Sequence, residues 1–107
     1  MIAGGIESMA RRADIEAALR RLAPRIPDHE FGAVIDHAAG SRGLRSAAPE
    51  TAAWLSMVAY VRHTLTDYDA LLAEGYSSDE ARFFVMEEMQ TVLRGWGVRR
   101  PLSVGED

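Results

Sequence analysis

The sequence contains no cysteine. Structural disulfides, thiol catalysis and thiolate metal sites are therefore excluded, because each of them needs a cysteine sulfur. The same absence fits a cytoplasmic protein, since thiols are kept reduced in that compartment. Lysine is absent as well, so all twelve basic residues are arginine, which a bias in genome composition explains at least as well as a function does.

Long apolar segments are also missing. No apolar run approaches the length of about 20 residues that a membrane-spanning helix needs. The first six residues, Met1–Ile6, have neither a basic lead nor a sustained apolar stretch, so they make a poor signal peptide. We therefore expect a cytoplasmic protein with no membrane partner.

Positive charge is scarce in the second half of the chain. There, five arginines oppose nine acidic residues, whereas seven arginines balance seven acidic residues in the first half. The whole chain carries a net charge of -4. This balance argues against a broad electrostatic attraction to nucleic acid, but it leaves room for a local anion site.

Apolar residues recur at helical spacing along most of the chain, and no convincing alternating strand is present. The first helix is predicted over about 8–23, where Pro24 and Pro27 end it. Asp28 is predicted to cap a second helix, which ends before the loop 40–46 with its two glycines.

Three more helix starts follow in the second half. Pro49 fits the first turn of a third helix, which ends or bends near Thr66. The segment 66–69 has the form of a capping box and would restart a short helix that Gly75 closes. A second capping box at 77–80 opens a long last helix that ends at the glycines following it.

These elements predict an all-α fold, a compact bundle or orthogonal array of four to five helices. A chain of this length supports one core, so we expect a single domain over 1–107. Its ordered core is expected at about 8–98, and its tail, 99–107, is expected to be flexible. The large apolar side chains assigned to the core are Trp54, Phe83, Phe84, Met86, Met89 and Trp96.

Polar residues that can interact with one another gather around the end of the third helix. If that helix ran straight on, Arg62, Thr66 and Asp69 would lie on one face. Arg62 would then pair with Asp69, because an unpaired charge at the edge of the core costs several kcal/mol. On a neighbouring face, Asp67 could orient the imidazole of His63, one turn away.

Two interpretations of these residues stay open. In the functional one, His63 is the acid/base and Arg62 the anion clamp of a small polar site. In the structural one, the network fixes a bend between two helices, with Thr66 and Asp69 as capping groups. No obvious nucleophile accompanies them, which favours the structural interpretation. A rigid polar network whose outer face binds a ligand would combine the two interpretations.

The same segment carries a family resemblance. The chain reads Arg62-His63-x-x-Thr66-x-Tyr68-Asp69-x-Leu71-Leu72, followed by Gly75 and Glu80-Ala81-Arg82. This pattern resembles the signature of the domain of unknown function 2293 family, which occurs in bacterial and fungal proteins. Upstream residues from Pro49 to Val61 and Trp96 near the end resemble it too, so the similarity covers roughly 15–96.

The resemblance implies no activity, because the family has no assigned reaction or catalytic residues to transfer. It does mark recurrent polar positions, which we treat as candidate binding residues: Arg62, His63, Thr66, Tyr68, Asp69 and Arg82. Some bacterial relatives look longer and more basic than this chain. The acidic balance here therefore weakens any nucleic-acid role taken from them.

Weaker candidates lie elsewhere. Arg42 and Arg45 belong to a loop before a helix start, where two guanidinium groups and backbone amides could hold a phosphate or carboxylate. Their spacing matches no phosphate-binding loop, so a solvated loop is the favoured interpretation. His29, His37 and His63 match no metal-binding pattern, and we expect neither a metal nor a cofactor.

The leading functional hypothesis is a non-enzymatic protein-interaction module, with a homodimer as one form of it. It rests on the absence of catalytic motifs and on two adjacent aromatics, Phe83 and Phe84, which one helix face cannot readily bury together. Two alternatives remain. An enzyme would use a polar site at Arg62, His63 and Asp69. A nucleic-acid-binding module would use Arg11, Arg12, Arg20, Arg21, Arg42 and Arg45.

Overall fold

The structure is a computed structural model that describes residues 2–103, with side chains from Ser8 onward. It contains five α-helices and one short 3₁₀ turn: α1 (Ile2–Leu22), α2 (Asp28–Gly40), η1 (Arg42–Leu44), α3 (Pro49–Leu65), α4 (Tyr68–Ala73) and α5 (Ser78–Gly95). No strand occurs within residues 2–103. The predicted all-α fold of four to five helices is confirmed.

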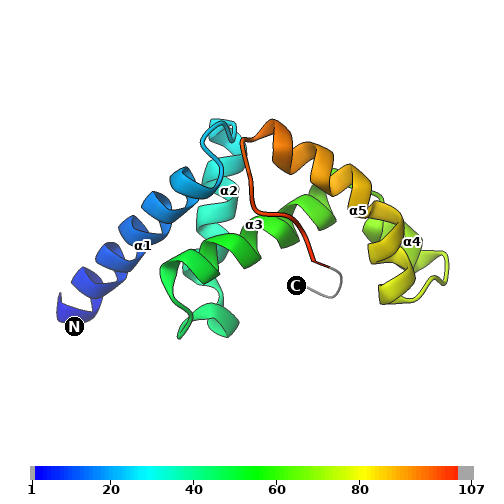
Figure 1. The fold of residues 1–107 in the computed structure, drawn as a ribbon. Coiled ribbons are helices and arrows are strands. Elements are labelled where there is room, and N and C mark those ends of the chain that lie inside the picture. Colours follow the sequence, from blue (N-terminus) through cyan, green and yellow to red (C-terminus); the bar gives the residue numbers. More distant parts are fainter. Residues whose placement is uncertain (1, 104–107) are drawn as a thin grey trace.

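Helix α3 lies at the centre of the molecule and contacts the other four α-helices. Helices α1 and α2 pack on each other and on α3, whereas α4 and α5 pack together at the far end of α3. In Figure 1, α1 and α5 form the two limbs of an arch, and α3 runs beneath it. The result is an elongated particle of 47 × 27 × 22 Å.

The core forms around α3. Its side chains Trp54, Met57, Val58 and Val61 are at most 1 % exposed. The apolar stripes that surround them are contributed by three helices: Ile15 and Leu19 of α1, Val34 and Ile35 of α2, and Val85 and Met89 of α5. One core therefore joins the first three helices to the last one.

Two helix starts differ from the prediction. Helix α1 begins at Ile2 and not near Ser8. No proline interrupts this stretch, and each of its two early glycines costs only about 1 kcal/mol in a helix. Helix α2 begins at Asp28, but its N-cap is Pro27 and no side chain caps it. The capping role of Asp28 is therefore wrong, and its carboxylate lies in the first turn, at the positive end of the helix dipole.

Other predicted starts are confirmed. Pro49 is the first residue of α3. At the start of α5, the Ser77 amide donates to the carboxylate of Glu80 at 2.8 Å, and the Glu80 amide donates to Ser77 Oγ at 3.1 Å. This reciprocal pair is the capping box that the sequence predicts.

Two glycines end helices α4 and α5, as predicted. Gly75 and Gly97 have φ values of +104° and +88°, a left-handed region that favours glycine because it lacks Cβ. After each of them the chain bonds back to the last helical turn. The Val98 amide, for example, donates to the Leu93 carbonyl at 2.9 Å. Such bonds satisfy carbonyls that the helix end would otherwise leave unpaired.

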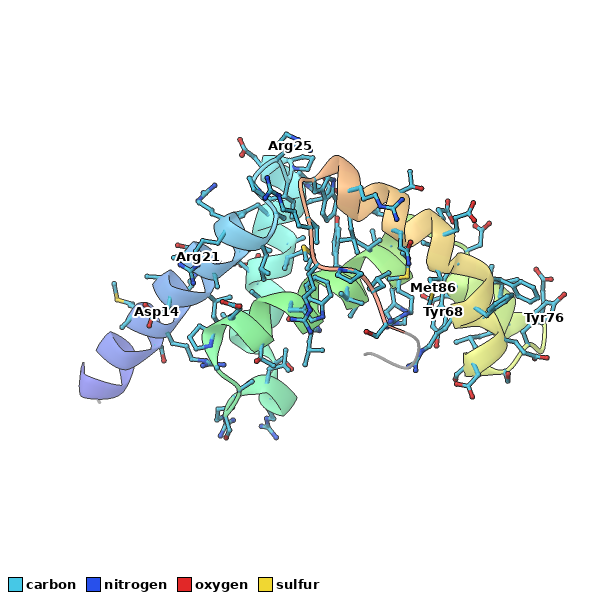
Figure 2. All side chains as sticks on the ribbon, in the orientation of Figure 1. Asp14, Arg21, Arg25, Tyr68, Tyr76 and Met86 are labelled. Carbon is cyan, nitrogen blue, oxygen red and sulfur yellow. The ribbon has the colours of Figure 1, made fainter. Side chains whose placement is uncertain are left out.

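The end of α5 is joined to the corner between α1 and α2. The Arg25 amide donates to the Trp96 carbonyl at 2.8 Å, and Arg25 Nη2 donates to the Arg94 carbonyl at 3.3 Å. Figure 2 shows Arg25 at this corner, where the two limbs of the arch meet. These bonds close the arch at its top.

After α5, the chain runs back across α3 (Figure 1). The guanidinium carbon of Arg100 lies 4.1 Å from the centre of the Trp54 ring, a cation–π geometry. Leu102 is partly buried against the core. Arg100 and Leu102, which lie in the expected flexible tail, therefore contact the core. Residues 104–107 of that expected tail lie outside the described residues.

Helices α2 and α3 are also linked by a partly buried phenol. The Tyr60 hydroxyl of α3 donates to Glu30 Oε2 of α2 at 2.9 Å. Burial raises the pKa of Tyr60 above its ordinary value of 10.0, and the hydrogen bond to Glu30 and the charge of that carboxylate raise it further.

The pH dependence of stability follows from this shift. A group whose pKa is higher in the folded protein stabilises the fold below its unfolded pKa, and that contribution is lost as the pH rises through the folded pKa. We therefore expect the wild type to lose stability above about pH 10 more steeply than Tyr60→Phe, which has no phenol to ionise at that position. Urea unfolding from about pH 8 to 11 measures this, and parallel profiles would contradict it.

We expect Gly97→Ala to lower the free energy of unfolding by at least about 1–2 kcal/mol. A Cβ at this left-handed position would lie 3.0 Å from Pro24 Cδ, at the closure of the arch. Gly95→Ala is the matched control, because a Cβ there would meet nothing within 4 Å and alanine is the better helix former. Urea denaturation compares the two variants, and equal losses would contradict the role given to Gly97.

Candidate functional site

The polar cluster of the sequence lies at the corner between α3 and α4. Helix α3 ends at Leu65, and Thr66 is extended, with φ -134° and ψ 173°. The Thr66 hydroxyl donates to the Arg62 carbonyl and accepts from the Tyr68 amide at 3.2 Å. The predicted break at Thr66 is therefore confirmed, and one side chain bridges the two helices across it.

The predicted capping box at 66–69 does not form. The N-cap of α4 is Asp67, which makes no side-chain capping bond. Asp69 instead accepts from His63, with 2.8 Å between Nδ1 of the ring and Oδ1 of the carboxylate. The expected pairing of His63 with Asp67 is therefore wrong, because the break turns α4 so that Asp69 meets His63. The expected pairing of Arg62 with Asp69 stays a prediction.

The cluster has a buried layer and an exposed layer. Arg62 and Tyr68 are only 6 % and 4 % exposed, and the guanidinium carbon of Arg62 lies 5.7 Å from the centre of the Tyr68 ring. The side chains of His63 and Asp69 are 50 % and 62 % exposed. The His63 ring packs edge-on against Tyr68, with 5.2 Å between ring centres. Arg82, the last candidate, is half-buried on α5.

The chemistry available at this corner is limited. A histidine paired with a carboxylate can transfer protons. The Thr66 hydroxyl of the same cluster is engaged with a backbone carbonyl, so it does not serve as a nucleophile. This arrangement favours the structural interpretation, in which the buried layer fixes the corner and the outer pair faces solvent.

A second feature, which we call the aromatic tip, consists of Tyr76, Phe83 and Phe84. These side chains are 41 %, 74 % and 56 % exposed. Their rings meet edge to face, with centres 5.4 Å apart for Tyr76 and Phe84 and 5.9 Å apart for the two phenylalanines. Figure 2 shows Tyr76 at the outer end of the α4–α5 pair.

The assignment of both phenylalanines to the core is wrong. Helix α5 faces the core with Ala81, Val85 and Met89, spaced four residues apart. Positions 83 and 84 fall outside that stripe because successive helical residues are about 100° apart. An open hollow of about 480 Å³ lies beside the two rings, bordered also by Met86, Glu87 and Gln90.

The six arginines of the nucleic-acid hypothesis do not share one face. Arg11, Arg12, Arg42 and Arg45 border one hollow. Arg20 lies over the Phe31 ring at 4.0 Å. Arg21 borders a different hollow, together with Arg99 and Arg100, which the sequence-based set left out. The nearness of Arg21 to Arg99 and Arg100 depends on the segment that runs back across α3 after α5. No spacing in the sequence reveals this nearness.

The histidines are dispersed as well. His37 Nδ1 lies 3.1 Å from Ser56 Oγ, which links α2 to α3. Within the described residues, no three histidine, aspartate or glutamate side chains gather closely enough to hold a metal ion. None of the described helices is both long and apolar enough to cross a membrane.

The exposed pair, His63 and Asp69, and the buried layer, Arg62 and Tyr68, make different contributions to the stability of the fold. We expect Asp69→Asn to cost less than about 1 kcal/mol, because solvent-exposed ion pairs contribute little. Tyr68→Ala should cost about 3–5 kcal/mol, because it empties a buried aromatic position. Chemical denaturation measures both, and a loss above about 2 kcal/mol for Asp69→Asn would contradict the division into two layers.

Comparisons with known proteins place the chain in a family. A family described as an uncharacterized conserved protein, DUF2293, matches residues 18–97. This range holds the end of α1, all of α2 to α5, and the polar cluster. No curated protein and no solved structure matches the chain. Because the match spans well over half of its length, the chain belongs to the DUF2293 family, as its sequence motif predicted.

Proposed function

We propose that the protein is a non-enzymatic binding module whose aromatic tip receives an apolar and basic segment of a partner protein. The single observation that carries the proposal is the exposure of Phe83 and Phe84 at consecutive positions of α5. Isolated exposed apolar side chains are normal in soluble proteins. Here the Phe84 ring contacts both other rings, and the three form a continuous apolar surface, which is typical of interaction sites.

The charges around the tip indicate the chemistry of the partner. Over 67–95, seven acidic residues oppose two arginines. Asp79 and Glu80 are exposed in the first turn of α5, and Glu87 borders the hollow beside the phenylalanine rings. A partner segment that carries basic residues next to apolar ones would complement both features.

A second copy of the chain fits the tip less well. A symmetric dimer through this surface would bring the carboxylates of both copies together, and such like-charge contacts are unfavourable. We therefore assign the tip to a different, basic protein and treat the homodimer as an outcome that would contradict the proposal.

The two alternative functions have less support. An enzyme at Arg62, His63 and Asp69 would rely on acid–base chemistry by the exposed His63–Asp69 pair, because the Thr66 hydroxyl of that cluster is engaged with a backbone carbonyl and offers no free nucleophile. A nucleic-acid surface needs its arginines on one face, whereas Arg20 and Arg21 lie apart from the other four.

A library of random peptides, displayed on phage and selected on the immobilised protein, tests the proposal without knowledge of the partner. We expect the enriched peptides to combine apolar side chains with a net positive charge. Phe83→Ala should weaken their binding about tenfold to hundredfold, because fully burying a phenylalanine contributes about 1.5–3 kcal/mol. Met9→Ala is the matched control, since Met9 is also 74 % exposed but lies on α1.

Both substitutions remove exposed side chains, so each should change the stability by no more than about 0.5 kcal/mol. The proposal is overturned if no peptide is enriched, if the enriched peptides are acidic, or if Phe83→Ala and Met9→Ala act alike. It is also overturned if sedimentation shows a concentration-dependent dimer that Phe83→Ala abolishes, because a second copy would then occupy the tip.

A further inference from the structure

A hollow of about 430 Å³ lies between α1, the end of α2 and the η1 turn. We call it the arginine groove, because four arginines and two serines border it: Arg11, Arg12, Arg42, Arg45, Ser8 and Ser41. No acidic side chain is among the described residues that line it. Its volume falls within the range of about 300–1,000 Å³ that small-molecule sites occupy. It lies at the other end of the molecule from the aromatic tip (Figure 1).

Two of its arginines hold the walls in place. Arg11 donates from Nη1 to the Ala47 carbonyl at 2.9 Å and from Nη2 to the Leu44 carbonyl at 2.7 Å. Arg12 Nη2 lies 2.6 Å from Asp36 Oδ1 on α2. These contacts tie the turn after α2 to α1, and α1 to α2. The part-buried bonds of Arg11 therefore position the turn before any ligand arrives, which lowers the entropic cost of binding.

The other two arginines face solvent. Arg42 and Arg45 lie three positions apart, at the start and at the C-cap of the η1 turn. Residues at this spacing in a 3₁₀ turn are eclipsed, so both side chains leave the same side of the turn. Within the described part of the chain, neither of them forms an ion pair. Two neighbouring like charges with no acidic partner destabilise the turn slightly, and a bound anion would reverse that effect.

The balance of charge at the groove is positive. Of the four arginines, Arg12 is offset by Asp36 and Glu16. The end of α2, at Gly40, presents the negative end of a helix dipole, which is worth only about half a charge. The dipole therefore does not cancel the charges of Arg42 and Arg45.

We propose that the arginine groove binds a phosphate group, carried either by a small phosphorylated molecule or by a nucleic-acid backbone. The planar guanidinium fork matches the oxygens of a phosphate and can donate two hydrogen bonds to it. Arg42 and Arg45 supply two such forks on one side, and the hydroxyls of Ser8 and Ser41 supply further donors at the walls.

Inorganic pyrophosphate, titrated into the isotope-labelled full chain at constant ionic strength, tests the site by nuclear magnetic resonance. We expect the amide signals of residues 41–45 to shift. Arg42→Gln and Arg45→Gln should each weaken binding about tenfold or more, because each removes charged hydrogen bonds to the ligand. Arg21→Gln removes the same charge from α1 at a different hollow, and it should weaken binding less than about twofold.

A single-stranded oligonucleotide of about ten nucleotides distinguishes the two sources of phosphate. Binding about tenfold tighter than that of pyrophosphate, with a steeper salt dependence and the same loss in Arg42→Gln, would identify a nucleic-acid backbone. Comparable affinities would identify a small phosphorylated ligand. Either result supports the groove.

The inference is overturned if neither probe shifts the signals of residues 41–45. It is also overturned if Arg21→Gln weakens binding as much as Arg42→Gln does, because the attraction would then be that of charge in general. Phe83→Ala should leave pyrophosphate binding unchanged. The failure of this proposal and the failure of the one for the aromatic tip can therefore be told apart.

Discussion

Helix α3 must be covered on nearly every side, because eight of its seventeen residues are buried. The buried positions do not form a single stripe, since Ser56, Met57 and Val58 are consecutive. Three consecutive residues span about 200° of a helix surface, which one partner helix cannot cover. Helices α1, α2 and α5 share this task, and Arg100 of the returning chain covers the Trp54 ring. The shape of the arch follows from the need to enclose α3.

The two candidate surfaces, the aromatic tip and the arginine groove, take no part in covering α3. Helix α5 gives α3 the narrow stripe of Ala81, Val85 and Met89, which leaves the opposite side of its first turns to Phe83 and one flank to Phe84. The arginine groove lies between α1, the end of α2 and the η1 turn, and none of the residues that line it belongs to α3 or to the core. The exposed side chains at the two places, Phe83 and Phe84 at the tip and Arg42 and Arg45 at the groove, can therefore change without disturbing the core.

The sequence predicted those structural features that depend on residues close to one another along the chain. Pro49, the pair Ser77 and Glu80, and the glycines at the helix ends act through local backbone chemistry, so the limits of most helices could be found. The motif that identified the family is equally local. The corrections concern contacts between elements. Asp69 meets His63 only after the chain turns at Thr66, and Arg11 bonds to carbonyls 33 and 36 positions away, which no helical period reveals.

The closure at the top of the arch sets an order of events during synthesis. It joins Arg25 to Arg94, which are 69 positions apart, whereas the contacts among α1, α2 and α3 need only residues up to Leu65. The first three helices can therefore pack while α5 is still inside the ribosome, and the arch closes last. A nascent chain that stops before Ser78 lacks α5, so it leaves the face of α3 that α5 covers open to water. That face is apolar, so its exposure makes the incomplete chain prone to aggregation.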